Sequence, residues 1–214
     1  MLRQAPGNAS RLRLSSAVAG LMLCITTLAN AASDLDAAMG LVRDTTTNLL
    51  AAVQSDQAQI EKDPNHALTL VSRHLAPHMD IQKSARRVLG RHWKGASETQ
   101  RERFVGEFKV MLLRTYGTAI ADSPNVQIQY ELVRERRKHE AEVRTRIPRT
   151  TGDAVPVYYR LHNRSGDWKL YDVVIAGISL LATYRSSFGQ MVKRDGMDVL
   201  LDALEKKNRS YKTI

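Results

Sequence analysis

Residues 155–175 read VPVYYRLHNRSGDWKLYDVVI, and this stretch decides the fold class. In its first part apolar residues alternate with polar ones, which is the pattern of a half-buried β-strand. The residues on the apolar face are Val155, Val157, Tyr159 and Leu161. The segment Asn163–Asp167 then supplies polar and glycine residues over a length that suits a hairpin turn. The stretch therefore predicts two adjacent antiparallel strands.

The second of these strands, Trp168–Ile175, is apolar on both faces near its end, as in a strand that is covered on both sides. Simple alternation places Trp168, Leu170, Asp172 and Val174 on one face. The same rule places Tyr171, Val173 and Ile175 on the other face.

Two earlier runs of the chain show the same two-residue alternation. The apolar faces carry Val126, Ile128, Tyr130 and Leu132 in the first run, and Ala141, Val143, Thr145 and Ile147 in the second. Between the two runs lies the densest charge run of the chain, Arg134-Glu135-Arg136-Arg137-Lys138, which we place at a hairpin tip. The four runs together predict a four-stranded antiparallel meander.

Helical patterns flank the strands on both sides. The segments before the strands are Ser33 to Gln57, Asp63 to Leu75, Ile81 to Leu89, and a stretch that opens with the capping box Ser97-Glu98-Thr99-Gln100 and continues with Phe104, Phe108, Leu112, Tyr116 and Ile120. Helical spacing returns after Gly177 with Leu181, Tyr184 and Phe188. The order predicts an α+β fold: N-terminal helices, the four-stranded sheet, and C-terminal helices packed on the sheet around an apolar pocket.

The composition is typical of a globular protein, and the first residues have the pattern of a cleavable leader. The chain has 214 residues, one cysteine, 43% hydrophobic residues and a net charge of +10, which excludes a disordered chain and a disulfide-stapled miniprotein. Arg3, Arg11 and Arg13 precede the uncharged run Leu14–Leu28, and Ala29-Asn30-Ala31 follows as a cleavage pattern. We expect residues 1–31 to be a secretory signal peptide and residues 32–214 to form a single domain. The alternative is an N-terminal membrane anchor that is retained.

Signals for catalysis or metal binding are weak. His74 and His78 have the spacing of a metal pair, but Pro77 between them should end the helix. His66, His92, His139 and His162 are isolated in the sequence and are interpreted as surface residues. Ser179 lacks the second glycine of a nucleophile elbow, so its hydroxyl is expected to cap the next helix. We predict no catalytic residues and no metal.

The apolar faces can enclose either a solid core or a ligand cavity. Only 6% of the residues are aromatic, so a cavity lined mainly by Leu, Ile, Val and Met would favour a flexible hydrocarbon chain over a planar ring. The basic run from Arg134 to Lys138 suits anionic headgroups or an acidic protein, if it is not simply a solvated turn. Nucleic acid is not expected, because aromatic residues are not interleaved with the basic ones.

Two segments resemble the MlaC family. The first is YDVVIAGISL at Tyr171–Leu180, continued by Tyr184-Arg185 and Phe188. The second is Pro77-His78 followed by VLGRHW at Val88–Trp93 and by Gln100-Arg101. The resemblance implies a periplasmic phospholipid carrier of the outer-membrane lipid asymmetry pathway, a family also known for toluene tolerance. It further implies a deep apolar pocket for acyl chains and binding without covalent chemistry.

The resemblance also implies partners, but the candidate site residues come from the inward faces. The partners would be an inner-membrane ABC transporter complex with MCE domains and an outer-membrane lipoprotein–porin complex, met by a monomer through transient membrane contact, with phospholipid as cargo and no cofactor. The predicted lipid-binding residues are Phe108, Leu112, Tyr116, Val143, Val157, Tyr159, Val173, Ile175, Tyr184 and Phe188. The predicted partner or membrane surface is Arg134, Arg136, Arg137 and Lys138.

Two other classes of function remain open at this stage. One is a periplasmic enzyme on a cone-shaped α+β scaffold, with a small-substrate pocket and Asp172 as its acid or base. The other is a structural adaptor of the cell envelope, which would have no cavity.

Overall fold

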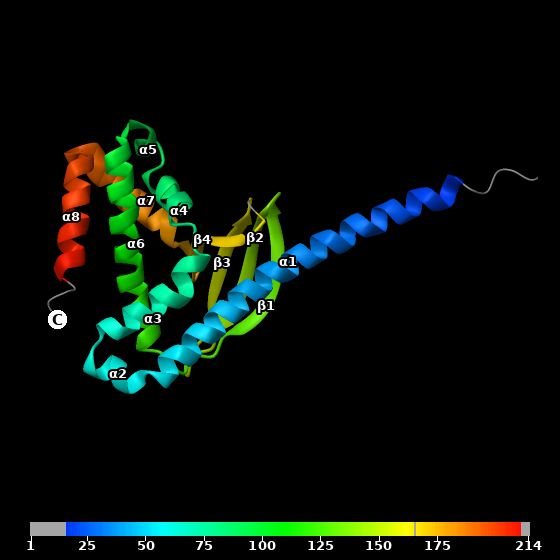
Figure 1. Cartoon of the computed structure of the whole chain (residues 1–214), viewed down its shortest axis with the longest axis horizontal. Helices are drawn as coiled ribbons and strands as arrows, with labels where there is room; N and C mark the ends of the chain where they lie inside the picture. Colours follow the sequence, from blue (N-terminus) through cyan, green and yellow to red (C-terminus); the bar gives the residue numbers. More distant parts are fainter. Residues whose placement is uncertain (1–15, 165, 211–214) are drawn as a thin grey trace, which may run out of the picture.

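A twisted antiparallel sheet forms one side of the structure, a computed structural model that describes residues 16–164 and 166–210 (Figure 1). Its strands are β1 (Gln129–Arg137), β2 (Glu140–Ile147), β3 (Val155–Asn163), β4 (Trp168–Ile175) and β5 (Ile178–Ser179). They lie in sequence order, each antiparallel to the next. The meander and the α+β class are therefore confirmed.

The described part of the sheet has five strands and not the predicted four. The additional strand is β5, which has only two residues and pairs with the end of β4. Ala176 and Gly177 both have positive φ, at 50° and 82°, and turn the chain back onto β4 within two residues. So short a strand leaves no alternating pattern in the sequence.

Bulges shift the faces of two strands relative to simple alternation. In β1 the register shifts between Tyr130 and Leu132, so Leu132 turns outward and is 46% exposed, while Val133 pairs with Val143. The prediction that Leu132 shares a face with Tyr130 is wrong for this reason.

In β4 the register shifts at Tyr171, where Asp172 pairs with Arg160 and Leu170 pairs with Leu161. Val173, opposite Tyr159, therefore returns to the face of Leu170, and Asp172 moves to the other face. The predicted faces of β4 are wrong beyond Tyr171.

The basic run is a strand and not a hairpin tip. Arg134, Arg136 and Arg137 belong to β1, and the turn to β2 falls at Lys138 and His139, which has a φ of 61°. Arg134 lies opposite Glu142 of β2, and the opposite charges of this cross-strand pair support continued pairing.

The helices are α1 (Ser16–Ser55), α2 (Gln57–Lys62), α3 (Asn65–Leu75), α4 (Ile81–Leu89), α5 (His92–Gly95), α6 (Glu98–Ala121), α7 (Leu180–Asp195) and α8 (Met197–Ser210), with a short 3₁₀ turn η1 at Ala76–His78. The predicted capping box of α6 is confirmed, because Ser97 and Gln100 exchange side-chain to backbone hydrogen bonds of 3.0 and 3.1 Å. The predicted cap of α7 is confirmed as well, because the Ala182 amide donates to Ser179 Oγ at 3.1 Å.

Helix α1 crosses one face of the sheet, and its N-terminal part extends beyond the rest of the fold (Figure 1). Of the predicted signal peptide, residues 1–15 lie outside the described residues, and residues 16–31 belong to this helix. Among the residues that the structure describes, no helix is both long enough and apolar enough to cross a membrane.

Candidate functional site

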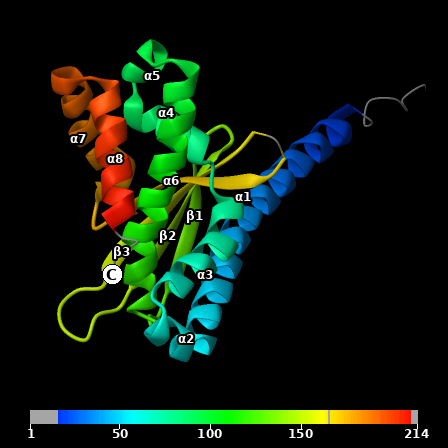
Figure 2. The ribbon, with the colours of Figure 1, turned by 60° about the vertical axis from the view of Figure 1, so that its left-hand side comes forward.

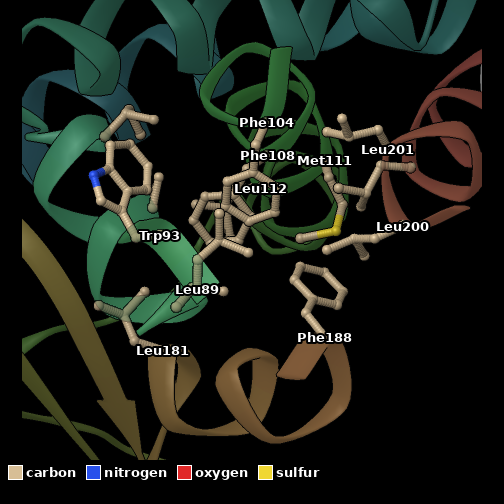
Figure 3. Close-up of a cluster of buried hydrophobic side chains, with 14 of the residues drawn as sticks. Leu89, Trp93, Phe104, Phe108, Met111, Leu112, Leu181, Phe188, Leu200 and Leu201 are labelled. Carbon is tan, nitrogen blue, oxygen red and sulfur yellow. The ribbon is translucent and has the colours of Figure 1, made fainter. Parts of the chain in front are cut away.

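Helices α4 to α8 enclose an apolar cluster, here called the helical cluster (Figure 3). Phe104, Phe108 and Met111 of α6 and Leu200 and Leu201 of α8 are at most 1% exposed. Phe188 rises from α7 and meets Phe104 and Phe108 edge to face, with ring centroids 6.0 and 6.3 Å apart. The four-residue spacing along α6 thus places its stripe against two C-terminal helices.

A second apolar cluster, the sheet cluster, lies between α1 and one face of the sheet. Its buried members are Ala38 and Val42 of α1 and Ala141, Val143, Leu161, Trp168 and Leu170 of the strands. Trp168 Nε1 donates to the backbone oxygen of Asp34 at 2.9 Å and so fixes the helix to β4.

The two clusters are built by different helices, and Met79 packs against both. The segment around Met79 is fastened to the sheet, because the Asp80 amide donates to the Leu170 carbonyl at 2.8 Å. A third group around Leu49, Val53, Leu70 and Val71 joins α1 to α3, and Leu75 connects it with the sheet cluster. Figure 2 shows α3 and α6 standing between α1 and the C-terminal helices.

The predicted lipid-binding residues fall into two groups by burial. Phe108, Leu112, Val143, Val157 and Phe188 are buried and at most 9% exposed. Tyr116, Tyr159, Val173, Ile175 and Tyr184 are only part-buried. The structure therefore places the first group in the core packing. The second group retains accessible surface, and all of its members except Ile175 pack at the margins of the two clusters.

Tyr159 has an unusual position among these marginal residues. Burial raises the pKa of its phenol to about 12, and the neighbouring Tyr130 acts in the same direction. The side chain nevertheless keeps part of its accessible surface. Tyr159 therefore combines a desolvated phenol with a side chain that is not fully enclosed.

Tyr116 and Tyr184 form the corresponding margin of the helical cluster. Their hydroxyl oxygens are 3.3 Å apart, and the Tyr184 ring meets Phe108 edge to face at 5.7 Å. Both side chains pack against the cluster and combine an apolar ring with a polar hydroxyl. Such an edge can contact a molecule that is apolar at one end and polar at the other.

The opposite face of the sheet is polar and contains a buried carboxylate. The Glu142 side chain is 2% exposed, and in the described residues four arginines contact it. These are Arg134 at 2.9 Å, Arg144 at 3.1 Å, Arg160 at 3.3 Å and Arg136 at 3.6 Å. These four cations outnumber Glu142 and Asp172, which Arg160 also contacts, so this surface, here called the arginine face, has an excess of positive charge.

Asp172, the acid or base of the enzyme alternative, is fully engaged by structural contacts. Its carboxylate accepts hydrogen bonds from Ser179 Oγ at 2.7 Å, Arg160 Nη1 at 3.0 Å and the Leu181 amide at 3.2 Å. These bonds tie the first turn of α7 to β4 and the arginine face. This carboxylate is therefore buried and joins β3, β4 and α7.

A buried polar network between α4 and the sheet was not recognised from the sequence. Lys83 and Arg87 reach Glu140 at 3.1 and 2.9 Å, and the Tyr171 hydroxyl donates to the same carboxylate at 3.2 Å. Burial alone would raise the pKa of Glu140, but the hydrogen bond and charge of Lys83, joined by Arg87, lower it. The contacts link residues far apart in the sequence, so no local pattern announces them.

His162 belongs to the same region and is buried, which corrects its interpretation as a surface residue. Its Nε2 lies 2.8 Å from Asp80 Oδ2, and Asp80 also caps α4 by accepting from the Lys83 amide. Burial lowers the pKa of His162, as does the charge of Lys83, while Asp80 opposes them. In the described part of the chain no three His, Cys, Asp or Glu side chains lie close enough together to hold a metal ion.

Comparisons with known proteins agree on one family. A family model described as "MlaC protein" matches residues 43–206. The chain is 30% identical over 169 residues to the intermembrane phospholipid transport system binding protein MlaC of Haemophilus influenzae, which covers 77% of this chain and 79% of that protein. It is 28% identical over 160 residues to the toluene tolerance protein ttg2D of Pseudomonas putida, which covers 74% of each.

A solved structure is similar over most of the fold. It is a phospholipid-binding protein from Ralstonia solanacearum in complex with a phospholipid, and it superimposes with a TM-score of 0.72 at 26% identity. The superposition covers 80% of this chain and 96% of that protein.

Proposed function

This chain belongs to the MlaC family, and from that premise we propose that it is a phospholipid carrier that binds acyl chains in its apolar interior and leaves the headgroup near solvent. The observation that carries the proposal is the similarity to a fold that was solved with a phospholipid bound. The division of the apolar interior into a helical cluster and a sheet cluster agrees with it.

The acyl chains are proposed to lie between the two clusters. The side chains proposed to contact them are the part-buried ones at the cluster margins, Tyr116, Tyr159, Val173 and Tyr184, together with the part-buried Ile175 of β4. The fully buried residues Phe108, Leu112, Val143, Val157 and Phe188 would support this lining from behind.

A lipid that crosses an aqueous compartment needs a carrier, because exposing its acyl chains to water costs free energy. Burial of one CH₂ group is worth about 0.8 kcal/mol, so two acyl chains exposed to water would cost on the order of 20 kcal/mol. Spontaneous passage through an aqueous compartment is negligible at that cost. A protein that covers the chains lowers the barrier without any covalent chemistry, and we propose that this chain is not an enzyme.

The cellular setting is also a proposal. The signal-peptide pattern at residues 1–31 supports export to the periplasm. There the protein would act as a monomer that shuttles phospholipid between the inner and outer membranes and maintains outer-membrane lipid asymmetry. Its partners would be the inner-membrane transporter with MCE domains and the outer-membrane lipoprotein–porin complex.

The arginine face is proposed as the surface that meets a membrane or an acidic partner. Arg134 remains 52% exposed although it pairs with Glu142, and Arg137 and Lys138 at the adjacent hairpin are exposed. Exposed cations of this kind attract anionic surfaces at long range, and salt weakens the attraction.

Native mass spectrometry with organic extraction tests the carrier proposal. The mature protein, purified from a bacterial periplasm without added lipid, should carry about one phospholipid per chain. An empty protein that also fails to take up lipid from vesicles would contradict the proposal.

A substitution tests where the acyl chains lie. Val173→Trp adds bulk at a part-buried position and should reduce co-purified lipid while the protein stays folded. The matched control is Leu132→Trp, which adds the same bulk on the exposed side of β1. If both variants retain lipid like the wild type, the acyl chains do not contact Val173.

A further inference from the structure

A separate hollow of about 370 Å³ lies where the α4–α5 junction meets α7. Its polar lining consists of Arg91, His92, Arg185, Ser186, Gln190 and Lys193. Leu89, which is 1% exposed and belongs to the helical cluster, contributes apolar surface. None of the residues proposed to contact acyl chains lines this hollow, here called the α7 pocket.

The α7 pocket collects positive charge without a compensating anion. Arg91, Arg185 and Lys193 line it together with His92, and no carboxylate is among its described lining residues. None of the three cations forms an ion pair within the described chain. By contrast, Arg103 of α6 is held by Asp202 and Glu205, each at 2.7 Å. Like charges that share a hollow repel one another, so an anion bound there would relieve the repulsion.

The backbone positions one of these cations. Gly90 ends α4 with a φ of +53°, a conformation that favours glycine. The Arg185 guanidinium lies so close that a Cβ on residue 90 would be 3.1 Å from its Nε and Nη2 atoms. The missing side chain therefore makes room for the Arg185 side chain against the turn.

The donors of the α7 pocket suit a phosphate group. A guanidinium can donate two parallel hydrogen bonds to phosphate oxygens, and a lysine adds a point charge. The Ser186 hydroxyl and the Gln190 amide line the same hollow and can donate to further oxygens. We propose that the α7 pocket is a binding site for a phosphate-bearing ligand, either a free phosphate or a lipid headgroup, in addition to the acyl-chain site.

The experiment is a titration of the mature protein, with its co-purified lipid, followed by ¹H–¹⁵N NMR at constant ionic strength. Inorganic phosphate should shift the amide signals of Gly90 and Gly189 at the α7 pocket in a saturable manner. Acetate at the same ionic strength is the control for general anion effects. Equal saturable shifts with acetate would overturn the assignment to phosphate.

Variants locate the binding to the α7 pocket. Arg185→Gln should lower the affinity for phosphate about tenfold or more, because it removes a charged donor from an exposed position without disturbing the core. Arg91→Gln should act in the same direction. Lys109→Gln removes an exposed cation of α6 outside the pocket and should leave the affinity unchanged. An Arg185→Gln protein that binds phosphate like the wild type would overturn the proposal.

A second arm distinguishes the two sources of phosphate. Dihexanoylphosphatidylglycerol, kept below its micelle concentration, presents a lipid headgroup in soluble form. Shifts at Gly90 and Gly189 with this lipid but not with inorganic phosphate assign the site to a headgroup, and shifts with phosphate assign it to free phosphate. If neither ligand shifts the Gly90 and Gly189 signals, the phosphate-site proposal is overturned, even where mass spectrometry finds a co-purified phospholipid. The phosphate-site proposal and the carrier proposal can therefore fail separately.

Discussion

Glu142→Gln removes the anion at the centre of the arginine face while it keeps the shape of the side chain. Glu142 is 2% exposed, and four described guanidinium groups lie within 3.6 Å of its oxygens. Removing one partner of a buried ion pair costs about 3–5 kcal/mol, because the remaining charge is left uncompensated. The arginines are 23–52% exposed and partly screened by water, so the lower end of the range applies. We expect the free energy of unfolding to fall by about 3 kcal/mol.

Urea unfolding followed by circular dichroism at pH 7 measures this loss. For a domain of this size, 3 kcal/mol corresponds to a fall in Tm of about 6–12 °C. The matched control is Glu135→Gln on β1, because Glu135 is exposed and has no ion pair among the described contacts. A Glu142→Gln protein within about 0.5 kcal/mol of the wild type would refute the reasoning that this carboxylate stabilises the sheet.

The same loss has a defined dependence on pH. Burial alone would raise the pKa of Glu142, but its bonds to Arg144, Arg160 and Arg134 lower it below the ordinary value of 4.5. A carboxyl group with a lowered folded-state pKa contributes stability that is present above the unfolded pKa and is lost as the pH falls through the folded pKa. The difference between the wild type and Glu142→Gln should therefore be full at pH 7 and shrink below about pH 4.5.

Three further measurements test other parts of the structure. Replacing Arg134, Arg136, Arg137 and Lys138 by serine should slow lipid transfer to anionic vesicles at low salt. If the variant transfers lipid at the wild-type rate across a range of salt concentrations, the arginine face is not the contact surface. Because burial holds the pKa of His162 below 6.5, the folded state resists its protonation, and stability should decline as the pH falls through 6.5. His162→Asn should flatten that decline in urea unfolding between pH 7 and 5. Ser97→Ala should cost about 1 kcal/mol by removing the cap of α6, and an unchanged urea midpoint would contradict this.

Local patterns were sufficient to predict the long helices and the four long strands of this fold. The stripe from Phe104 to Tyr116 and the capping box before it predicted α6, since both signals lie within one helix. Alternation along β3 predicted the buried face of Val157 and Leu161 for the same reason. In each case the residues that decide the structure are close together in the chain.

The faces of β1 and β4 required information that alternation does not contain. One bulge beside Leu132 and another at Tyr171 each reverse the side on which later residues point. The second bulge moved Asp172 from an apolar face to the arginine face, where Arg160 and Ser179 engage it. Because of the one extra residue in β4, Asp172 lies on the arginine face and makes structural contacts there.

The sequence could predict which residues of the candidate site point inward, but not how deeply each side chain is buried. Alternation and helical spacing identified inward positions, yet they could not separate Phe108 in the packed core from Tyr116 at its margin, because both lie on the same stripe of α6. That distinction depends on which helix lies opposite. Phe108 meets Phe104, Tyr184 and Phe188, whereas the Tyr116 hydroxyl reaches only as far as that of Tyr184 among its described contacts.

The division of the interior into two clusters bears on how a lipid could leave. A single continuous core resists opening because all of its contacts must break together. Here α4 to α8 build most of the helical cluster, with Tyr171 of β4 as a further member, α1 and the strands build most of the sheet cluster, and Met79 packs against both. Parting the clusters would therefore expose the proposed acyl chains while each cluster keeps its own packing. An acceptor that favours the open state would have to offset the lipid contacts and the polar bonds that join α4 and α7 to the sheet, such as those of Glu140 and Asp172, but not the stability of the whole fold.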